Sequence, residues 1–306
     1  MIEIEGLTKR YGSTYAVHDL TFTVRPGHVT GFLGPNGAGK STTMRMILGL
    51  DRPTTGRVRV DGTRYTSLKY PLRHVGALLD ASAVHPGRTA RAHLREIAAS
   101  NHLDSRRVRS VLAAVGLEDV ADRRVKGFSL GMRQRLGIAT ALLGNPRVLM
   151  FDEPVNGLDP EGIRWIRDLM RSLAADGKTV FVSSHLMSEM EHTADHLVVI
   201  GKGRLIADMS TRELIASASG GFLRIRSSDQ PRLIGLLAQA HGSVTPDEDG
   251  MIRVVGLSTD VVGKIAYENG VALLEMTPHK SSLEEAYLEL TESSVEYRGS
   301  GPEGRR

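Results

Sequence analysis

The run VTGFL (Val29–Leu33), followed directly by GPNGAGKST (Gly34–Thr42), decides how the rest of this chain is interpreted. The first run is short and mostly apolar, which predicts a buried strand, and a helix is expected to begin near Lys40. The residues between them match G-x-x-x-x-G-K-[ST] in the strand-then-helix context that this phosphate-binding motif requires. Glycines let successive N–H groups point at phosphate oxygens, and the helix dipole adds positive potential. The alternative is a glycine-rich turn with a chance Lys-Ser pair.

Each residue type in the loop suits a separate task on a nucleotide. Lys40 is expected to hold the β- and γ-phosphates, Ser41 to coordinate Mg²⁺ through its hydroxyl, and Thr42 to donate a hydrogen bond to phosphate. The residues of the loop that we predict to contact the nucleotide are Gly34, Asn36, Gly37, Ala38, Gly39, Lys40, Ser41 and Thr42.

A second acidic segment is placed to complete such a site. The apolar run Val148–Phe151 predicts a buried strand and ends in Asp152 and Glu153. A carboxylate at the carboxyl end of a strand beside a phosphate loop is placed to bind Mg²⁺, which we assign to Asp152. Glu153 is then suited to orient the attacking water and accept its proton. The alternative is an ordinary acidic pair at a strand end.

Further short apolar runs, with helical patterns between several of them, predict an α/β domain over residues 1–215. The expected strands are Val29–Leu33, Val75–Leu79, Val148–Phe151, Thr179–Val182 and Leu197–Ile200. Strands that alternate with helices indicate a mainly parallel sheet covered on both faces.

The pattern changes after a Ser/Gly-rich stretch at residues 216–221. The following segments predict the order β-α-β-β-α-β: strand Phe222–Arg226, helix Pro231–Ala240, strands Ser243–Thr245 and Met251–Val255, helix Thr259–Asn269 and strand Val271–Met276. This is the order of a ferredoxin-like split βαβ fold. We therefore expect a small α+β accessory domain at 222–291, closed by an amphipathic helix at Leu283–Leu290, and a flexible tail at 292–306.

Composition restricts the class of protein. With 306 residues, 41% of them hydrophobic and 24% charged, the chain has the balance of a soluble globular protein of about two domains, which excludes disorder throughout. The absence of cysteine excludes disulfides, thiolate zinc sites and cysteine nucleophiles, and favours a reducing cytosolic compartment. Neither a secretion signal nor an apolar run of the ~20 residues that span a bilayer is visible.

Charge is distributed unevenly. The net charge of +4 is too small to argue for nucleic acid as a partner. Residues 85–135, however, carry eleven Lys/Arg against five Asp/Glu. This basic segment is either a solvated helical face or a surface turned toward anionic lipid or a membrane partner.

Three further segments give the chain a family resemblance. FSLGMRQR (Phe128–Arg135) resembles the signature motif of ATP-binding cassette proteins, Gly157–Asp159 resembles their D-loop, and His185 resembles their switch histidine. With the phosphate loop, their order and spacing make residues 1–215 similar to the nucleotide-binding subunit of an ABC transporter. The resemblance implies a P-loop NTPase cassette with a helical subdomain at about 85–140.

The same resemblance implies ATP and Mg²⁺ as ligands, ATP hydrolysis and a dimer of cassettes, with itself or with a similar cassette. It implies that His185 contacts the γ-phosphate, whereas an isolated histidine is more often only packed or solvated. Ser129 and Gly131 would contact the γ-phosphate held by the other protomer, and Asp159 is counted with the nucleotide-binding residues. Tyr11, after a short strand, corresponds to the aromatic that stacks on adenine, with plain packing as the alternative.

Asp80 is a departure from the family pattern. A glutamine usually ends the strand that corresponds to Val75–Leu79, and this chain has Asp80 there. The aspartate is shorter and can be anionic, so we expect it to bind Mg²⁺ through water. Leu130 and Met132 also depart from the common signature, while Ser129 and Gly131 remain.

With these departures and the appended α+β domain, the chain resembles the ATP-binding subunits of bacterial drug and antibiotic exporters of the bacitracin, lantibiotic and anthracycline types. The resemblance implies an ATPase that powers export of a drug, antibiotic or other hydrophobic or amphipathic compound. It would sit at the cytoplasmic face of the membrane through a separate ABC-2-type permease, without nucleic acid. The alternatives are an importer cassette, an exporter of ions or lipids, a soluble cassette ATPase acting on ribosomes or DNA, and a binding-only protein. For the accessory domain we weigh regulation or dimer stabilisation against simple self-packing.

Overall fold

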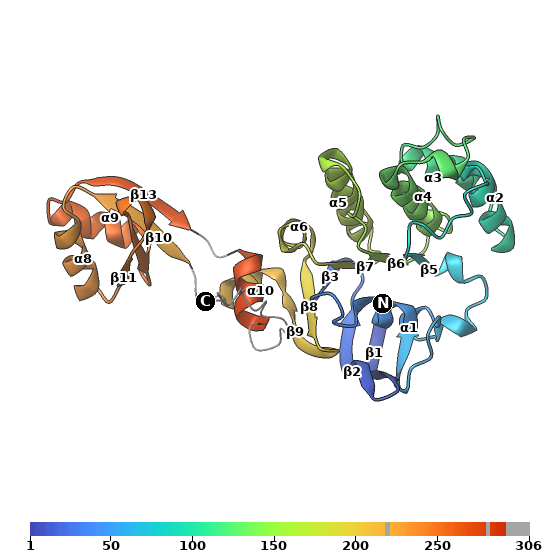
Figure 1. Cartoon of the computed structure of the whole chain (residues 1–306), viewed down its shortest axis with the longest axis horizontal. Coiled ribbons are helices and arrows are strands. Elements are labelled where there is room, and N and C mark those ends of the chain that lie inside the picture. Colours follow the sequence, from blue (N-terminus) through green and yellow to red (C-terminus); the bar gives the residue numbers. More distant parts are fainter. Residues whose placement is uncertain (218–220, 280–281, 292–306) are drawn as a thin grey trace, which may run out of the picture. The chain divides into compact units, whose positions relative to one another are not determined.

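The computed structural model describes residues 1–217, 221–279 and 282–291. They form two compact units, Met1–Thr211 and Arg212–Leu290, whose elements are labelled in Figure 1. The tail that we expected to be flexible, 292–306, lies outside the described residues.

A six-stranded sheet forms the centre of the first unit. Its strands, in spatial order, are β5 (Val75–Leu78), β6 (Val148–Asp152), β7 (Thr179–Ser184), β3 (Val29–Leu33), β8 (His196–Gly201) and β9 (Arg204–Ser210). All neighbours pair in parallel except β8 and β9, which are antiparallel. Every residue of β3 is buried because this strand is central in the sheet and covered on both faces. The predicted mainly parallel sheet is therefore confirmed.

A second, three-stranded antiparallel sheet was missed by the strand predictions. It has the order β2 (Thr14–Val24), β1 (Ile2–Tyr11), β4 (Thr55–Val60). It shares one hydrophobic core with helix α1 (Lys40–Ile47) and the parallel sheet, in which the rings of Phe22, Phe32 and Phe181 lie 5.1–6.0 Å apart between centroids. Tyr11 is the last residue of the ten-residue β1, so it does not follow a short strand as expected.

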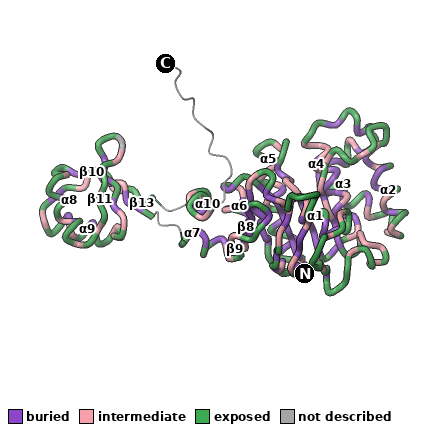
Figure 2. The backbone as a smooth tube through the Cα atoms, turned by 60° about the horizontal axis from the view of Figure 1, so that its bottom comes forward, coloured by how far each residue is buried: buried purple, intermediate pink, exposed green. Residues whose placement is uncertain are grey.

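Helices complete the first unit on the side away from the antiparallel sheet (Figure 1). They are α2 (Ala90–Ser100), α3 (Arg106–Ala114), α4 (Leu130–Leu142), α5 (Pro160–Ala175) and α6 (Met187–Thr193). The C-terminal end of α4 lies directly on β5, where a Cβ at Gly76 would be 1.9 Å from the carbonyl oxygen of Ala141. Only glycine allows this approach. Figure 2 shows how burial concentrates on the strands beneath these helices.

The second unit contains the predicted ferredoxin-like fold. Its elements are β10 (Phe222–Ser227), α8 (Gln230–Gln239), β11 (Ser243–Pro246), β12 (Ile252–Val255), α9 (Thr259–Glu268) and β13 (Leu273–His279). The antiparallel strand order is β11-β12-β10-β13. The last strand begins two residues later than predicted because the Val271 N–H donates to the Ala266 carbonyl at 2.9 Å, which ends α9.

Two more helices, α7 (Thr211–Ser217) and α10 (Leu283–Thr291), belong to the second unit except for Thr211 and Thr291. Among the described residues, the core of the ferredoxin-like sheet is built from β10, β12, α8, α9 and the segment around β13. We expected α10 to close this domain, but within the described chain Leu283 and its neighbours in α10 are absent from that core. Leu283, Ala286 and Tyr287 are buried, which confirms the apolar face of α10. That this face closes the domain stays a prediction.

Candidate functional site

The loop after β3 has the curled backbone that the sequence motif predicts. Gly37 and Gly39 have φ angles of +81° and +105°, a region that favours glycine. A Cβ at Gly39 would lie 2.5 Å from the Ala16 carbonyl oxygen in β2, so no larger residue fits there. The loop borders a cavity of about 240 Å³ lined by Ala16, Pro35, Asn36, Gly37, Gly39, Lys40, Ser41, Thr42 and Glu153.

Lys40 begins α1 and is buried at the mouth of the loop, with 7% of its surface exposed. Its Nζ donates to the Gly34 carbonyl at 2.6 Å and lies 4.0 Å from Oε1 of Glu153. Burial lowers the pKa of Lys40, while the carboxylates of Glu153 and Asp152 act in the opposite direction. The Lys40 amine is therefore buried between the loop backbone and the Glu153 carboxylate, beside the cavity that the loop borders.

Asp152 ends β6, and both of its carboxylate oxygens accept hydroxyl hydrogen bonds. Ser41 Oγ donates to Oδ2 at 2.7 Å, and Ser183 Oγ, from β7, donates to Oδ1. Ser183 was not among the predicted site residues. The sequence feature that could have identified Ser183 is a small hydroxyl side chain at the carboxyl end of a fully buried strand. This strand lies next to the one that bears the acids.

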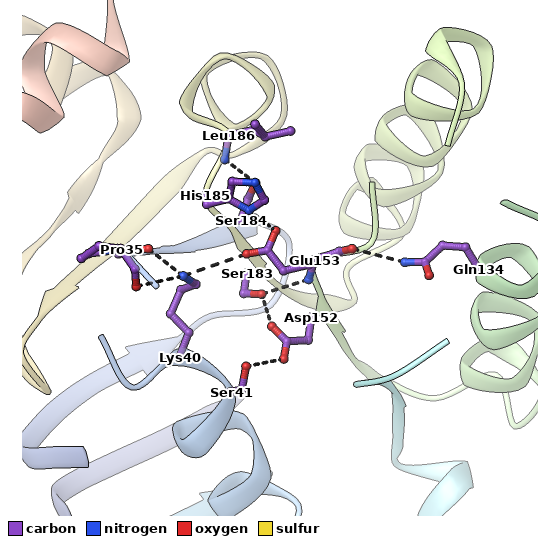
Figure 3. Close-up of polar contacts among 11 residues, drawn as sticks. Pro35, Lys40, Ser41, Gln134, Asp152, Glu153, Ser183, Ser184, His185 and Leu186 are labelled. Carbon is purple, nitrogen blue, oxygen red and sulfur yellow. Dashed lines mark hydrogen bonds and ion pairs between the residues drawn. The ribbon is translucent and has the colours of Figure 1, made fainter. Parts of the chain in front are cut away.

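Glu153 is the first residue after β6 and has a left-handed backbone with φ +49°. Its N–H donates to Ser183 Oγ at 3.0 Å, and its Oε2 lies 2.7 Å from Nδ1 of His185, the residue after β7. Its carbonyl accepts a hydrogen bond from Nε2 of Gln134 in α4 at 3.3 Å. Gln134 was also missed, because inside a signature-like motif nothing marks it as different from its neighbours. Figure 3 shows these side chains converging from α1, α4, β6 and β7.

The two adjacent acids therefore have different surroundings. Asp152 and Ser41 supply a carboxylate and a hydroxyl, the hard oxygen donors that Mg²⁺ accepts when phosphate and water complete its shell. In the described part of the chain, no group of three or more His, Cys, Asp or Glu could hold a metal ion by itself. The donor set fits a metal shared with a nucleotide and not a closed protein cage.

Other predicted residues lie apart from this cluster. Tyr11 is 52% exposed, and Nζ of Lys9 lies 4.9 Å from its ring centroid. Ser129 and Asp159 are helix N-caps: their side chains accept from the N–H groups of Met132 and Gly162, at the starts of α4 and α5.

Two glycines and one alanine play structural parts around the loop and the signature. A Cβ at Gly34 would lie 2.5 Å from the Ile200 carbonyl oxygen, and one at Gly131 would lie 3.2 Å from that of Gly157. Ala38 is 2% exposed and does not line the cavity. These residues set the close packing of the loop and of the α4 N-terminus.

Asp80 follows β5 and is used by its own turn. Its Oδ1 accepts the N–H and the hydroxyl of Ser82, both at 2.7 Å. These hydrogen bonds lower the pKa of Asp80, so its carboxylate is anionic at neutral pH. Among the described contacts, none joins Asp80 directly to Ser41 or Asp152.

No helix within the described ranges has both the length and the apolar character needed to cross a bilayer.

Comparison with known proteins agrees with this geometry. The family described as ABC transporter matches residues 17–156, and a domain of unknown function matches residues 221–284. The bacitracin transport ATP-binding protein BcrA of Bacillus licheniformis is 38% identical over 298 residues, which cover 95% of this chain and 97% of that protein. The lantibiotic transport ATP-binding protein SrtF of Streptococcus pyogenes is 36% identical over 68% of this chain and 90% of its own length.

Solved structures lead to the same family. An ATP-binding subunit of an ABC transporter superposes with a TM-score of 0.66 at 29% identity, covering 71% of this chain and 92% of that one. A dimeric bacterial ABC transporter cassette has a TM-score of 0.64 at 26% identity over 69% of this chain and 98% of its own. With the phosphate loop and the acid–histidine cluster in place, the chain belongs to the ATP-binding subunits of ABC transporters and is an ATPase.

Proposed function

We propose that this chain hydrolyses ATP to power export of an antibiotic or another hydrophobic or amphipathic compound through a separate ABC-2-type membrane permease. The observation that carries the proposal is the extent of the similarity to the bacitracin transport protein. It covers 95% of this chain and so includes the C-terminal unit, which a general cassette lacks.

The arrangement of the cluster supports specific roles for its residues. Lys40 and the loop N–H groups bind the β- and γ-phosphates. Ser41 and Asp152 would hold Mg²⁺, which when bound neutralises charge on the phosphate oxygens. Glu153 accepts the proton of the attacking water. Nδ1 of His185 lies 2.7 Å from the Glu153 carboxylate, so His185 orients that carboxylate and also contacts the γ-phosphate.

A second cassette completes the site in this proposal. Ser129 and Gly131 stand at the N-terminus of α4, where a hydroxyl and N–H groups suit the γ-phosphate bound by a partner cassette. Asp159 would lie at the same interface. Tyr11, half exposed at the end of β1, offers a ring face to adenine, and Asp80 would reach Mg²⁺ through water from the loop after β5.

The basic segment at 85–135 supports a position against the permease at the cytoplasmic face of the membrane. Four of its acids are already neutralised by arginines of the same segment, in the pairs Arg88–Glu96, Arg91–Asp122, Arg106–Asp104 and Arg109–Glu118. The exposed Arg123, Arg124 and Lys126 leave a positive surface next to the signature. Such a surface suits anionic headgroups or acidic loops of a membrane protein.

The test is co-purification of the Glu153→Gln protein from its own cells in gentle detergent with ATP present. Loss of the base should block hydrolysis and keep the closed dimer together, so a multi-span membrane protein is expected in equal amount. The wild-type protein with ADP is the matched control and should retain less of the same partner. Recovery of ribosomes, DNA or no partner would contradict the export proposal and favour a soluble cassette ATPase.

A further inference from the structure

The N-terminal turn of α4 is joined to the segment after β6 at two points. The side chain of Leu130 packs over Gly157, where a Cβ would lie 2.2 Å from Cδ2 of Leu130. One turn further along, Nε2 of Gln134 donates to the Glu153 carbonyl at 3.3 Å. The signature helix therefore contacts the segment 153–157 both through an apolar contact and through a hydrogen bond.

Gln134 is a buried residue of α4. It is 4% exposed, so its amide is hydrogen-bonded to the Glu153 carbonyl and not to solvent. The same carbonyl accepts the N–H of Asn156 at 3.2 Å, which closes the turn after the acid. A buried amide that lost its acceptor would remain without a hydrogen bond, so α4 and this carbonyl are held together.

The backbone of Glu153 needs such support. Its φ of +49° lies in the left-handed region, which is unfavourable for a residue with a Cβ. It is held from both sides, by Ser183 on the N–H and by Gln134 on the carbonyl. Its backbone angles aim the carboxylate at His185 and Lys40, so a change at either support would redirect the carboxylate.

We propose that Gln134 is a positioning residue, which makes the catalytic alignment of Glu153 depend on where the signature helix sits. The inference rests on the proposed function, in which Glu153 is the base and Ser129 and Gly131 contact the nucleotide of the partner cassette. When the nucleotide of the partner cassette binds the N-terminus of α4, any shift of α4 is passed through Gln134 to Glu153 of the same chain. Each of the two sites is thereby coupled to occupation of the other, and the coupling is reciprocal for binding.

The first test is Gln134→Met, which keeps the length and volume of the side chain and removes the donor. We expect kcat for ATP hydrolysis to fall roughly tenfold or more, because the contribution of a general base depends on the orientation of its carboxylate toward the attacking water. KM for ATP should stay within about twofold, since the phosphate contacts are untouched. The matched control is Gln230→Met, which removes an amide donor to the Gly250 carbonyl at 3.0 Å in the second unit and should leave kcat unchanged.

A double-mutant cycle separates positioning of the base from a general structural effect. In the Glu153→Gln background, Gln134→Met should cause no further loss of the residual single-turnover hydrolysis and no loss of the ATP-dependent dimer. An equal loss in both backgrounds, or a kcat unchanged by Gln134→Met, would overturn the proposal. If Gln134→Met fails to fold, Gln134→Leu replaces it, with a similar volume and no N–H donor. A wild-type protein that does not hydrolyse ATP would instead contradict the proposed function.

Discussion

At the scale of single residues, Asp152 and Glu153 are neighbours in sequence with different surroundings. Both oxygens of Asp152 accept from hydroxyls, whereas those of Glu153 face His185 and Lys40. The difference arises because Glu153 has a left-handed backbone, which turns its side chain away from that of Asp152. One serine, Ser183, touches both residues, since it donates to the Asp152 carboxylate and accepts the Glu153 N–H.

We predict that Ser183→Ala lowers kcat for ATP hydrolysis roughly 10- to 100-fold. This corresponds to about 1.5–3 kcal/mol, the contribution of a hydrogen bond to a charged group. Steady-state ATPase assays over a range of Mg²⁺ concentrations measure the effect, and the half-saturating Mg²⁺ concentration should rise because Asp152 is less fixed. Ser184→Ala is the control: Ser184 is equally buried, but in the described contacts its hydroxyl accepts the Leu186 N–H at 3.0 Å and touches neither acid. Equal losses in the two variants would argue against the role of Ser183.

At the scale of secondary-structure elements, the fit between α4 and the segment after β6 depends on a glycine. Gly157 has φ +76°, and the space that its Cβ would occupy is filled by Leu130. Leu130 stands where the family commonly has glycine. In this chain the contact between α4 and the segment 153–157 therefore consists of the Leu130 side chain packed against Gly157, which has no side chain of its own.

Gly157→Ala should therefore destabilise the protein by two separate effects, the unfavourable φ and the contact with Leu130. Gly177→Ala is a matched control, because Gly177 has φ +78° and no atom within 4 Å of its Cβ position. We expect Gly157→Ala to lower the free energy of unfolding by about 1–3 kcal/mol more than Gly177→Ala, as measured by denaturant titration. Adding Leu130→Ala should recover most of that excess. A double variant no more stable than Gly157→Ala would show that the contact is not the cause.

At the scale of the whole molecule, two of the hydrophobic cores in the described residues share no residue with each other. One joins the antiparallel sheet, α1 and the parallel sheet, and the other lies between the ferredoxin-like sheet and its helices. All parts of the ATP-hydrolysing cluster come from the first unit. The separate cores indicate that each unit stabilises itself, and we propose a regulatory or dimer-stabilising role for the second unit.

A chain ending at Ser219 should accordingly fold and hydrolyse ATP at about the rate of the full-length protein. Calorimetry should resolve two unfolding transitions for the full-length chain and one for the shortened chain, because separate cores unfold as separate cooperative units. Analytical ultracentrifugation with ATP tests the role of the second unit, and we expect a weaker dimer after truncation. Unchanged dimerisation would contradict that role, and an aggregated cassette would contradict the independence of the cores.

The amino-acid sequence by itself determined the phosphate loop, the strands of the parallel sheet, the positions of Asp152, Glu153 and His185 at strand ends, and the order of the ferredoxin-like unit. These features depend on short-range rules: glycine at positive φ, apolar runs for buried strands, and helix signals between them. Local pattern was insufficient for the antiparallel sheet, whose β1 contains register shifts that interrupt the alternation.

Only the tertiary structure decided which side chains meet. Ser183 touches Asp152 because β6 and β7 pair in parallel with these two residues opposite each other, and Gln134 reaches Glu153 because α4 packs beside the end of β6. Contacts between residues 19 to 31 positions apart depend on strand register and helix packing. These are set by the burial of the whole core, and no local stretch of sequence encodes them.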